Sequence, residues 1–117
     1  MLVVNRFVVE DEPTFRSRAS AALAALAGRP GYVSGAFGRS VDEPGTWCLV
    51  TRWESVGAYR RALSAFEVKV EATPLLAESL DEPSAFEVLL EAEPGGNVTT
   101  TRSDRAGGQP PALPSQP

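Results

Sequence analysis

Asn5, Trp53 and Tyr59 are the side chains of this sequence whose types are best suited to chemistry in a buried site. An amide and a phenol can donate hydrogen bonds to a developing negative charge, and an indole offers a flat apolar wall with one N–H donor. Each residue also has a structural interpretation, in which Asn5 satisfies a backbone group, Trp53 packs in the core and Tyr59 anchors a helix face. The residue types alone leave both interpretations open.

The composition restricts the chemistry further, because the chain has no histidine and one cysteine. Without an imidazole there is no Ser-His-Asp triad, no Cys-His dyad and no His-ligated zinc, iron or haem. With one thiol there is no internal disulfide, no thiolate zinc site and no iron–sulfur cluster. That thiol, Cys48, falls within a predicted strand, where we expect it to be buried and inert. Any catalysis would depend on carboxylates, Tyr, Trp, Asn, Arg, Ser or Thr, or on the substrate itself.

Length and charge exclude several classes of partner. The chain has 117 residues, with 11 Lys and Arg against 15 Asp and Glu, and a formal charge of −4. That length suits one domain with a modest core, and the acidic balance does not favour nucleic acid or an anionic membrane. No apolar run approaches the roughly 20 residues that span a bilayer, and the N-terminus has the pattern of a strand rather than of a secretion signal. We therefore expect a cytoplasmic protein with no nucleic-acid or membrane partner.

Four segments have the composition or the alternation of β-strands. They are residues 2–9, 32–40, 47–53 and 84–91. The turn-forming residues 42–45 predict that the second and third strands form a hairpin.

Two helices are predicted between these strands. The first begins near Asp11 and Pro13, which suit a helix N-terminus, and ends at Gly28; the second begins after Ser55, a plausible N-cap, and is interrupted at Pro74. The apolar side chains at helical spacing are Phe15, Ala19, Leu23 and Leu26 in the first helix and Tyr59, Leu63, Phe66 and Val70 in the second. Each helix is therefore expected to bury one face.

The order of these elements is β-α-β-β-α-β, which predicts an α+β, ferredoxin-like domain over residues 1–93. Its four-stranded antiparallel sheet would carry both helices on one face. Residues 94–117 are rich in Gly and Pro and poor in aliphatic side chains, so we expect a disordered tail there. The alternative is a partner-binding strap, with residues 110–114 as a polyproline-like ligand.

The first strand is apolar on both faces, since Leu2, Val4 and Val8 alternate with Val3 and Phe7. A sheet with two apolar faces needs a second cover besides its helices. The simplest cover is the same sheet of a second copy, so the pattern predicts a homodimer; a monomer with a somewhat apolar strand is the alternative.

The same alternation predicts where the candidate residues point. Asn5 shares a strand face with Val3 and Phe7, and Trp53 shares one with Leu49 and Thr51. If both faces meet the helices, Asn5 and Trp53 line the space between sheet and helices. A buried amide costs free energy unless it is paired, so Asn5 would bond to a backbone group or point into a cavity.

The segment Thr51-Arg52-Trp53-Glu54-Ser55, followed by Tyr59, resembles the antibiotic biosynthesis monooxygenase domain of the dimeric α+β barrel superfamily. The step from Gly31 to Gly35 into the second strand is also typical of that domain. The resemblance covers about residues 2–92 and implies that two ferredoxin-like sheets pair into an α+β barrel.

Two branches of the family are relevant. In the haem-degrading branch, Asn5 and Trp53 match residues that flank haem, but residues 64–69 have no histidine where the axial ligand would stand, so His-ligated haem breakdown is disfavoured. In the branch that oxidises aromatic polyketides without metal or flavin, Trp53 and Tyr59 match site residues, whereas Leu49 replaces an asparagine.

The resemblance therefore implies a monooxygenase that needs no cofactor and no metal. Its substrate would be a small aromatic such as an anthrone or a quinol, whose carbanion reduces dioxygen directly. Asn5 and Tyr59 would be hydrogen-bond donors, and Trp53 a pocket wall or a donor. The alternative function is a non-catalytic dimer of the same fold that binds a small apolar molecule or assists another protein.

Overall fold

The computed structural model describes residues 1–102, in two compact units of which the first is Met1–Phe86 and the second begins at Glu87. In chain order the elements are β1 (Leu2–Val8), α1 (Glu12–Ala27), β2 (Tyr32–Arg39), β3 (Thr46–Trp53), α2 (Val56–Leu63), α3 (Phe66–Glu71), α4 (Thr73–Leu76) and β4 (Ala85–Phe86) in the first unit, and β5 (Leu90–Ala92) and β6 (Val98–Thr100) in the second. Within residues 1–102, no helix combines the length and the apolar character that crossing a membrane requires.

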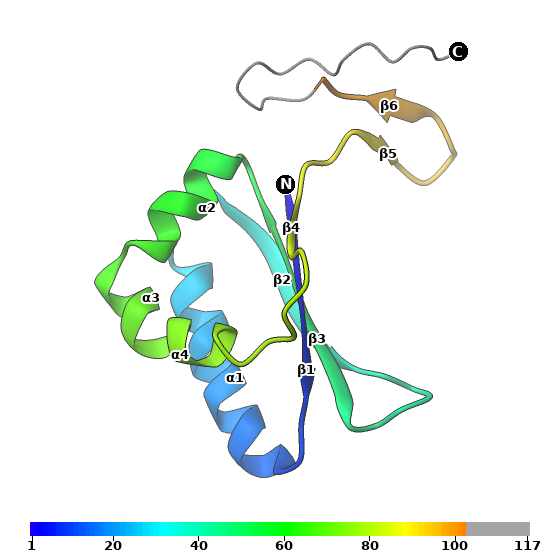
Figure 1. Cartoon of the computed structure of the whole chain (residues 1–117). Helices are drawn as coiled ribbons and strands as arrows, with labels where there is room; N and C mark the ends of the chain where they lie inside the picture. The colour runs from blue at the N-terminus through cyan, green and yellow to red at the C-terminus, as the bar shows by residue number, and fades with distance from the viewer. Residues whose placement is uncertain (103–117) are drawn as a thin grey trace. The chain divides into compact units, whose positions relative to one another are not determined.

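The first unit is built on a four-stranded sheet with the strand order β2-β3-β1-β4. Each neighbouring pair is antiparallel, and β1 and β3 occupy the centre with Asn5 opposite Leu49 and Val3 opposite Thr51. Helices α1 to α4 lie together on one side of this sheet (Figure 1). The predicted α+β, ferredoxin-like fold is therefore confirmed.

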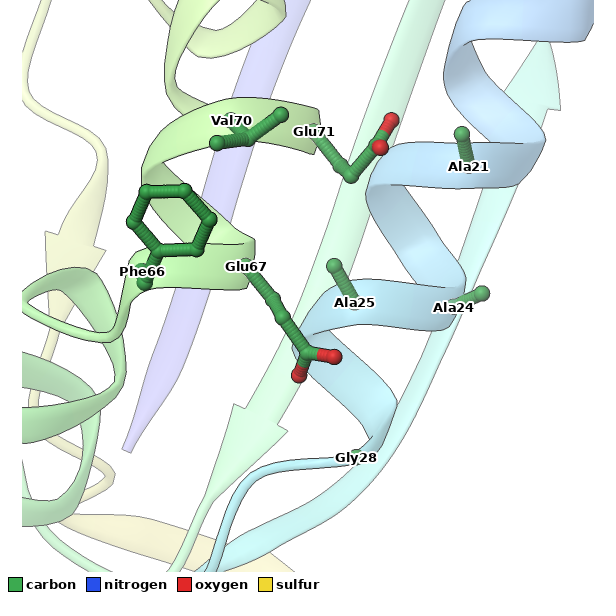
Figure 2. A pocket seen from close by; sticks show the side chains of 8 residues that line it. All are labelled: Ala21, Ala24, Ala25, Gly28, Phe66, Glu67, Val70 and Glu71. Atoms are coloured by element: carbon green, nitrogen blue, oxygen red, sulfur yellow. The ribbon is translucent and has the colours of Figure 1, made fainter.

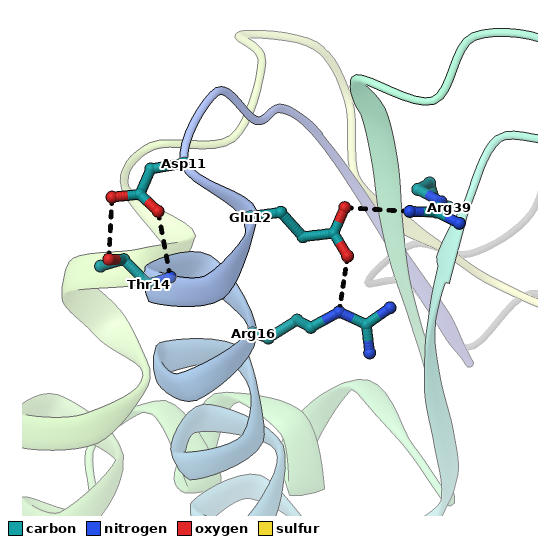
Figure 3. Close-up of polar contacts among 5 residues, drawn as sticks. All are labelled: Asp11, Glu12, Thr14, Arg16 and Arg39. Atoms are coloured by element: carbon teal, nitrogen blue, oxygen red, sulfur yellow. Dashed lines mark hydrogen bonds and ion pairs between the residues drawn. The ribbon is translucent and has the colours of Figure 1, made fainter.

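Helix α1 is fixed at its N-terminus by side chains that the sequence places there. Asp11 is the N-cap, and its carboxylate accepts hydrogen bonds from the Thr14 N–H at 3.3 Å and the Thr14 hydroxyl at 2.9 Å (Figure 3). Glu12 accepts from Arg16 at 2.7 Å and from Arg39 of β2 at 2.9 Å. The hydrogen bond from Arg16, with further help from Arg39, holds the pKa of Glu12 below its usual value. This bridge ties the start of α1 to the edge strand of the sheet.

The buried stripe of α1 follows the predicted spacing. Phe15, Ala19 and Leu26 are buried as expected, and Ala22 is fully buried in place of Leu23, which is partly buried. Small residues in the middle of the stripe let the helix backbone approach the sheet closely.

The second helical segment differs from the single helix that its spacing predicts. Ser55 caps α2 as expected, accepting from the Ala58 N–H at 3.0 Å, but Ala65 has extended backbone dihedrals and breaks the helix. The break changes which side chains are buried: Val68 is buried, whereas Phe66 is 79% exposed. The predicted apolar stripe is therefore wrong beyond the end of α2, because helical phase is not kept across an extended residue.

The last strand is shorter than the predicted segment 84–91. Backbone bonds from Leu80 N to Arg6 O at 2.8 Å and from Val4 N to Ser84 O at 2.7 Å run the chain along the edge of β1. Ladder pairing with β1 is restricted to Ala85 and Phe86, beside Pro83, which lacks the N–H that a ladder needs.

The second unit contains a small hairpin in which β5 pairs with β6 in antiparallel register. Gly95 and Gly96 both have positive φ angles in the connecting turn. Strand β6 falls inside the stretch from residue 94 for which the composition predicts disorder. The boundary at residue 93 stays a prediction, and residues 103–117, including the polyproline-like segment 110–114, lie outside the described residues.

The face of the sheet opposite the helices is mostly apolar, although Arg6 and Arg52 also lie on it. We call this the outer face; the strand register places on it Leu2, Val4, Val8, Ala36, Cys48, Val50 and Phe86. Val8 is 67% exposed and Phe86 47% exposed. Cys48, expected to be buried, is partly exposed there.

Gly31, which precedes β2, has a backbone that other residues rarely adopt. Its φ is +87°, and an added Cβ would collide with the Cβ of Ala58 in α2. We expect Gly31→Ala to lower the free energy of unfolding by about 2–4 kcal/mol, from left-handed strain and the collision together. Urea unfolding measures this effect. Gly38→Ala is the matched control, since nothing lies within 4 Å of a Cβ there; equal effects of the two changes would contradict the interpretation.

Candidate active site

The candidate residues of β1 and β3 lie on the helix-covered face of the sheet, which fulfils the condition under which alternation directs them toward the helices. Asn5 is 7% exposed, Thr51 2% and Trp53 1%. The register forms successive cross-strand rows, with Asn5 beside Leu49 in one and Val3 beside Thr51 in the next. Trp53 is in the row after that, where its backbone N–H donates to the backbone carbonyl oxygen of Met1 at 2.9 Å.

An aromatic cluster fills one end of this face. Its members are Phe7, Phe15, Phe37 and Trp47, with ring centroids 5.3 to 6.1 Å apart. The exposed guanidinium of Arg16 lies 5.3 Å from the Trp47 ring centroid. Three of the four side chains are pure hydrocarbon, so we assign this cluster to the core.

A second aromatic cluster at the other end carries hydroxyl groups. We call it the Tyr–Trp cluster: Tyr32, Trp53 and Tyr59. The Trp53 ring meets Tyr32 edge-on at 5.3 Å and Tyr59 at a tilt at 5.5 Å. Strand β3 supplies the indole, β2 supplies Tyr32 and α2 supplies Tyr59. The structure therefore brings two of the three predicted site residues, Trp53 and Tyr59, into contact.

The indole N–H of Trp53 already has a partner. Its Nε1–H donates to the hydroxyl oxygen of Thr51 at 2.9 Å, and both residues are buried. An indole has one N–H, so the bond to Thr51 occupies the donor that Trp53 could otherwise offer to a ligand. The geometry favours Trp53 as a wall of the site rather than as a donor.

Tyr32 is a site neighbour that the sequence pattern misplaces. Simple alternation sets it on the same face as Ser34, but the pairing with β3 shifts between Tyr32 and Ser34, which turns Tyr32 toward Trp53. A Cβ at Gly35 would lie 2.5 Å from the Tyr32 hydroxyl and 3.0 Å from the Thr51 methyl. A glycine inside a strand is the signal that could have indicated this close approach.

Asn5 occupies a different position from the Tyr–Trp cluster. Its side-chain oxygen is buried and has no hydrogen-bond partner among the described residues. Its strand partner, Leu49, precedes Trp53 by four residues, a separation of about 13 Å along the strand. An unpaired buried acceptor is costly, so a ligand hydroxyl at this position would remove a penalty as well as form a bond.

The electrostatics of the site are those of neutral hydroxyl groups. Burial raises the pKa of Tyr59 and of Tyr32 above the ordinary value of 10.0, so both phenols keep their protons at neutral pH. They can donate hydrogen bonds to an anion there, but they are not bases. Within residues 1–102, no three His, Cys, Asp or Glu side chains gather as metal ligands would.

The raised pKa of Tyr59 predicts a pH dependence of stability. The folded chain holds the phenolic proton in a pH range where the unfolded chain has lost it, so the unfolded state binds fewer protons there and stability falls as pH rises above 10.0. We expect Tyr59→Phe to reduce this slope. Urea unfolding of both proteins between about pH 9 and pH 11 measures it; parallel slopes would contradict the assignment.

A separate groove of about 580 Å³ lies between α1 and α3, away from these residues. Small side chains of α1 form one wall, and Phe66, Val70, Glu67 and Glu71 of α3 form the other (Figure 2). Neither Asn5 nor a member of the Tyr–Trp cluster lines it.

Comparison with known proteins identifies the family. The sequence matches the family model described as antibiotic biosynthesis monooxygenase over residues 2–70, more than half of the chain. The chain belongs to the antibiotic biosynthesis monooxygenase family. The match contains β1 to β3 and α2, and therefore Asn5, Trp53 and Tyr59.

Among proteins of this antibiotic biosynthesis monooxygenase family, the chain is 32% identical over 97 residues to deoxynogalonate monooxygenase of Streptomyces nogalater, covering 82% of each protein. It is also similar to crystal structures of SnoaB, a cofactor-independent oxygenase from the same organism. One matches with a TM-score of 0.61 at 28% identity, over 87% of this chain and 92% of that one. A monooxygenase-like structure from Fusobacterium nucleatum has a TM-score of 0.64 at 17% identity, over 86% of this chain and 48% of that one, and supports the fold alone.

Proposed function

We propose that this chain is a cofactor-independent monooxygenase that oxidises a small electron-rich aromatic, an anthrone or a quinol, with dioxygen. Family membership and 32% identity to a named monooxygenase support a monooxygenase of this type. The observation that carries the proposal is the contrast between the two aromatic clusters on one sheet face. The Tyr–Trp cluster sets hydroxyl groups around a buried indole, whereas the cluster at the other end is almost pure hydrocarbon.

The substrate would bind between the sheet and the helices. The Asn5 oxygen would accept a hydrogen bond from a substrate hydroxyl, and Trp53 would pack against a ring. The two positions are about 13 Å apart along the sheet, a span that suits fused rings better than a single ring. Tyr32 and Tyr59 are partly exposed, whereas Trp53 is buried, so the substrate would enter the site past these two phenols.

The reaction consumes one dioxygen and needs no other oxidant. The substrate carbon loses a proton to water, and the resulting carbanion transfers an electron to dioxygen. Joining of the two radicals forms the C–O bond, and protonation gives a hydroperoxide. Loss of water, with cleavage of the O–O bond, leaves a carbonyl: CH₂ + O₂ becomes C=O + H₂O.

Tyr59 would act at the first of these steps. Deprotonation of an anthrone moves negative charge onto its carbonyl oxygen, and a neutral phenol can donate a hydrogen bond to that oxyanion. One such donor in a water-poor site lowers the barrier by about 3–4 kcal/mol, or 10²–10³ in rate. Proton transfer then rests on the acidity of the substrate, which fits a site whose phenols are held neutral by burial.

The proposal includes a homodimer that covers the outer face. Val8 and Phe86, at 67% and 47% exposed in the single chain, would be buried by the same face of a second copy. Packing of the second copy on the outer face would also make the helix-covered site more rigid, because β1 and β3 contribute residues to both faces of the sheet.

The experiment is a measurement of oxygen uptake. Purified protein, treated with a chelator and checked for absence of flavin absorbance, is incubated in air with a panel of anthrones and quinols. We expect uptake matched one to one by quinone formation, and loss of most of it in Tyr59→Phe. A ligand that raises the melting temperature but is recovered unchanged would instead support the binding-protein alternative, and no uptake with any panel member would contradict the proposal.

A further inference from the structure

Thr51 is a polar residue in an otherwise apolar row of the sheet. Its neighbours in register are Val3 on β1 and Gly35 on β2, and its side chain is 2% exposed. A buried hydroxyl is costly unless it is bonded, and here it accepts the indole N–H of Trp53 at 2.9 Å. A valine would fill the same space without that bond.

The bond limits how the Trp53 ring can turn. Tyr32 at 5.3 Å and Tyr59 at 5.5 Å hold the ring by contact, but ring contacts tolerate rotation and sliding better than a hydrogen bond does. The bond to Thr51 fixes the edge that carries the nitrogen, and therefore the direction in which the rest of the indole ring points. A Cβ at Gly35 would lie 3.0 Å from the Thr51 methyl, so a glycine at that position leaves room for the threonine side chain.

We propose that Thr51 is a positioning residue, which holds the indole of Trp53 in the orientation that the oxygenation requires. This inference rests on the proposed function. Thr51 acts through Trp53 rather than on the reacting atoms, and loss of its hydroxyl changes kcat more than KM. Misplacement of a site wall reduces the fraction of bound substrate that is correctly aligned, without removing its apolar contacts.

The first part of the test does not depend on activity. In a Trp47→Phe background, Trp53 is the sole indole of the chain, since the sequence has two tryptophans. Its Nε1–H resonance in a ¹H–¹⁵N spectrum reports the hydrogen bond. We expect Thr51→Val to move that resonance upfield and to broaden it as the ring gains freedom, whereas Thr51→Ser keeps it near the position of the parent protein. Should Thr51→Val fail to fold, Thr51→Cys, with a weak acceptor, should give an intermediate shift.

The second part measures turnover. We expect Thr51→Val to lower kcat about tenfold, the value of one lost hydrogen bond, with KM within about threefold, and Thr51→Ser to retain most of kcat. An unmoved indole resonance, or a moved one with unchanged kcat, would overturn the proposal for Thr51 while leaving an active wild type and the proposed function intact. A wild type inactive on the whole panel would overturn the proposed function, and with it any role of Thr51 in a reaction.

Discussion

Trp53→Phe is expected to lower kcat/KM by about 100-fold. The change replaces the indole by a smaller phenyl ring and breaks the bond to Thr51, so a substrate ring bound as proposed could settle out of alignment. A displacement of about 1 Å in a site that works by orientation can cost 10² in rate. Steady-state oxygen uptake over a range of substrate concentrations measures the effect.

Trp47→Phe is the matched control for this change. It alters the other tryptophan of the same strand, which is also buried, at 6% exposed, but lies in the hydrocarbon cluster with Phe15. We expect its kcat/KM to stay within about threefold of the wild type, although both variants lose stability through a core substitution. If the two variants lost activity equally, the effect of Trp53→Phe would be one of stability, and the assignment of the site would be wrong.

Val50→Glu is expected to convert a dimer into a monomer. Val50 lies on the outer face at the centre of the sheet, opposite Val4 on β1 and Ala36 on β2. In a face-to-face dimer the two new carboxylates would enter an apolar interface near one another, which costs several kcal/mol and raises Kd at least about 100-fold. Light scattering after size exclusion should give twice 12.4 kDa for the wild type and 12.4 kDa for the variant at low micromolar concentration.

The control for the dimer is Val41→Glu. Val41 is 94% exposed in the connection between β2 and β3, so the same charge should change neither the mass nor the stability appreciably. A wild-type mass of 12.4 kDa would contradict the dimer, and a Val50→Glu variant that stays dimeric would place the interface elsewhere.

The central strands and α1 could be predicted because their information is local. Alternation in β1 and β3 depends on neighbouring residues alone, and it correctly grouped Asn5 with Val3 and Trp53 with Leu49 on shared strand faces, all of which are buried. The caps at Asp11 and Ser55 are equally local, since each side chain bonds three residues ahead.

The features that could not be predicted depend on contacts between distant segments. The register shift at Tyr32 exists only in the pairing of β2 with β3. The helix break at Ala65 is not marked by a proline or a glycine in the sequence. The bond from Trp53 to Thr51 is short in sequence, but alternation says which face two residues share and not which way an indole nitrogen points. The unpaired oxygen of Asn5 is likewise visible only once its surroundings are known.

Isotope labelling gives the most direct test of cofactor-independent oxygenation at this site. The chelator-treated, flavin-free protein is incubated with an anthrone that supports uptake, under ¹⁸O₂ in unlabelled water, and the product is analysed by mass spectrometry at a time when the uncatalysed reaction is negligible. We expect a quinone with one ¹⁸O atom, which the wild type forms about 100-fold faster than Trp53→Phe does. A quinone without the label, or one formed as fast by Trp53→Phe as by the wild type, would contradict this expectation.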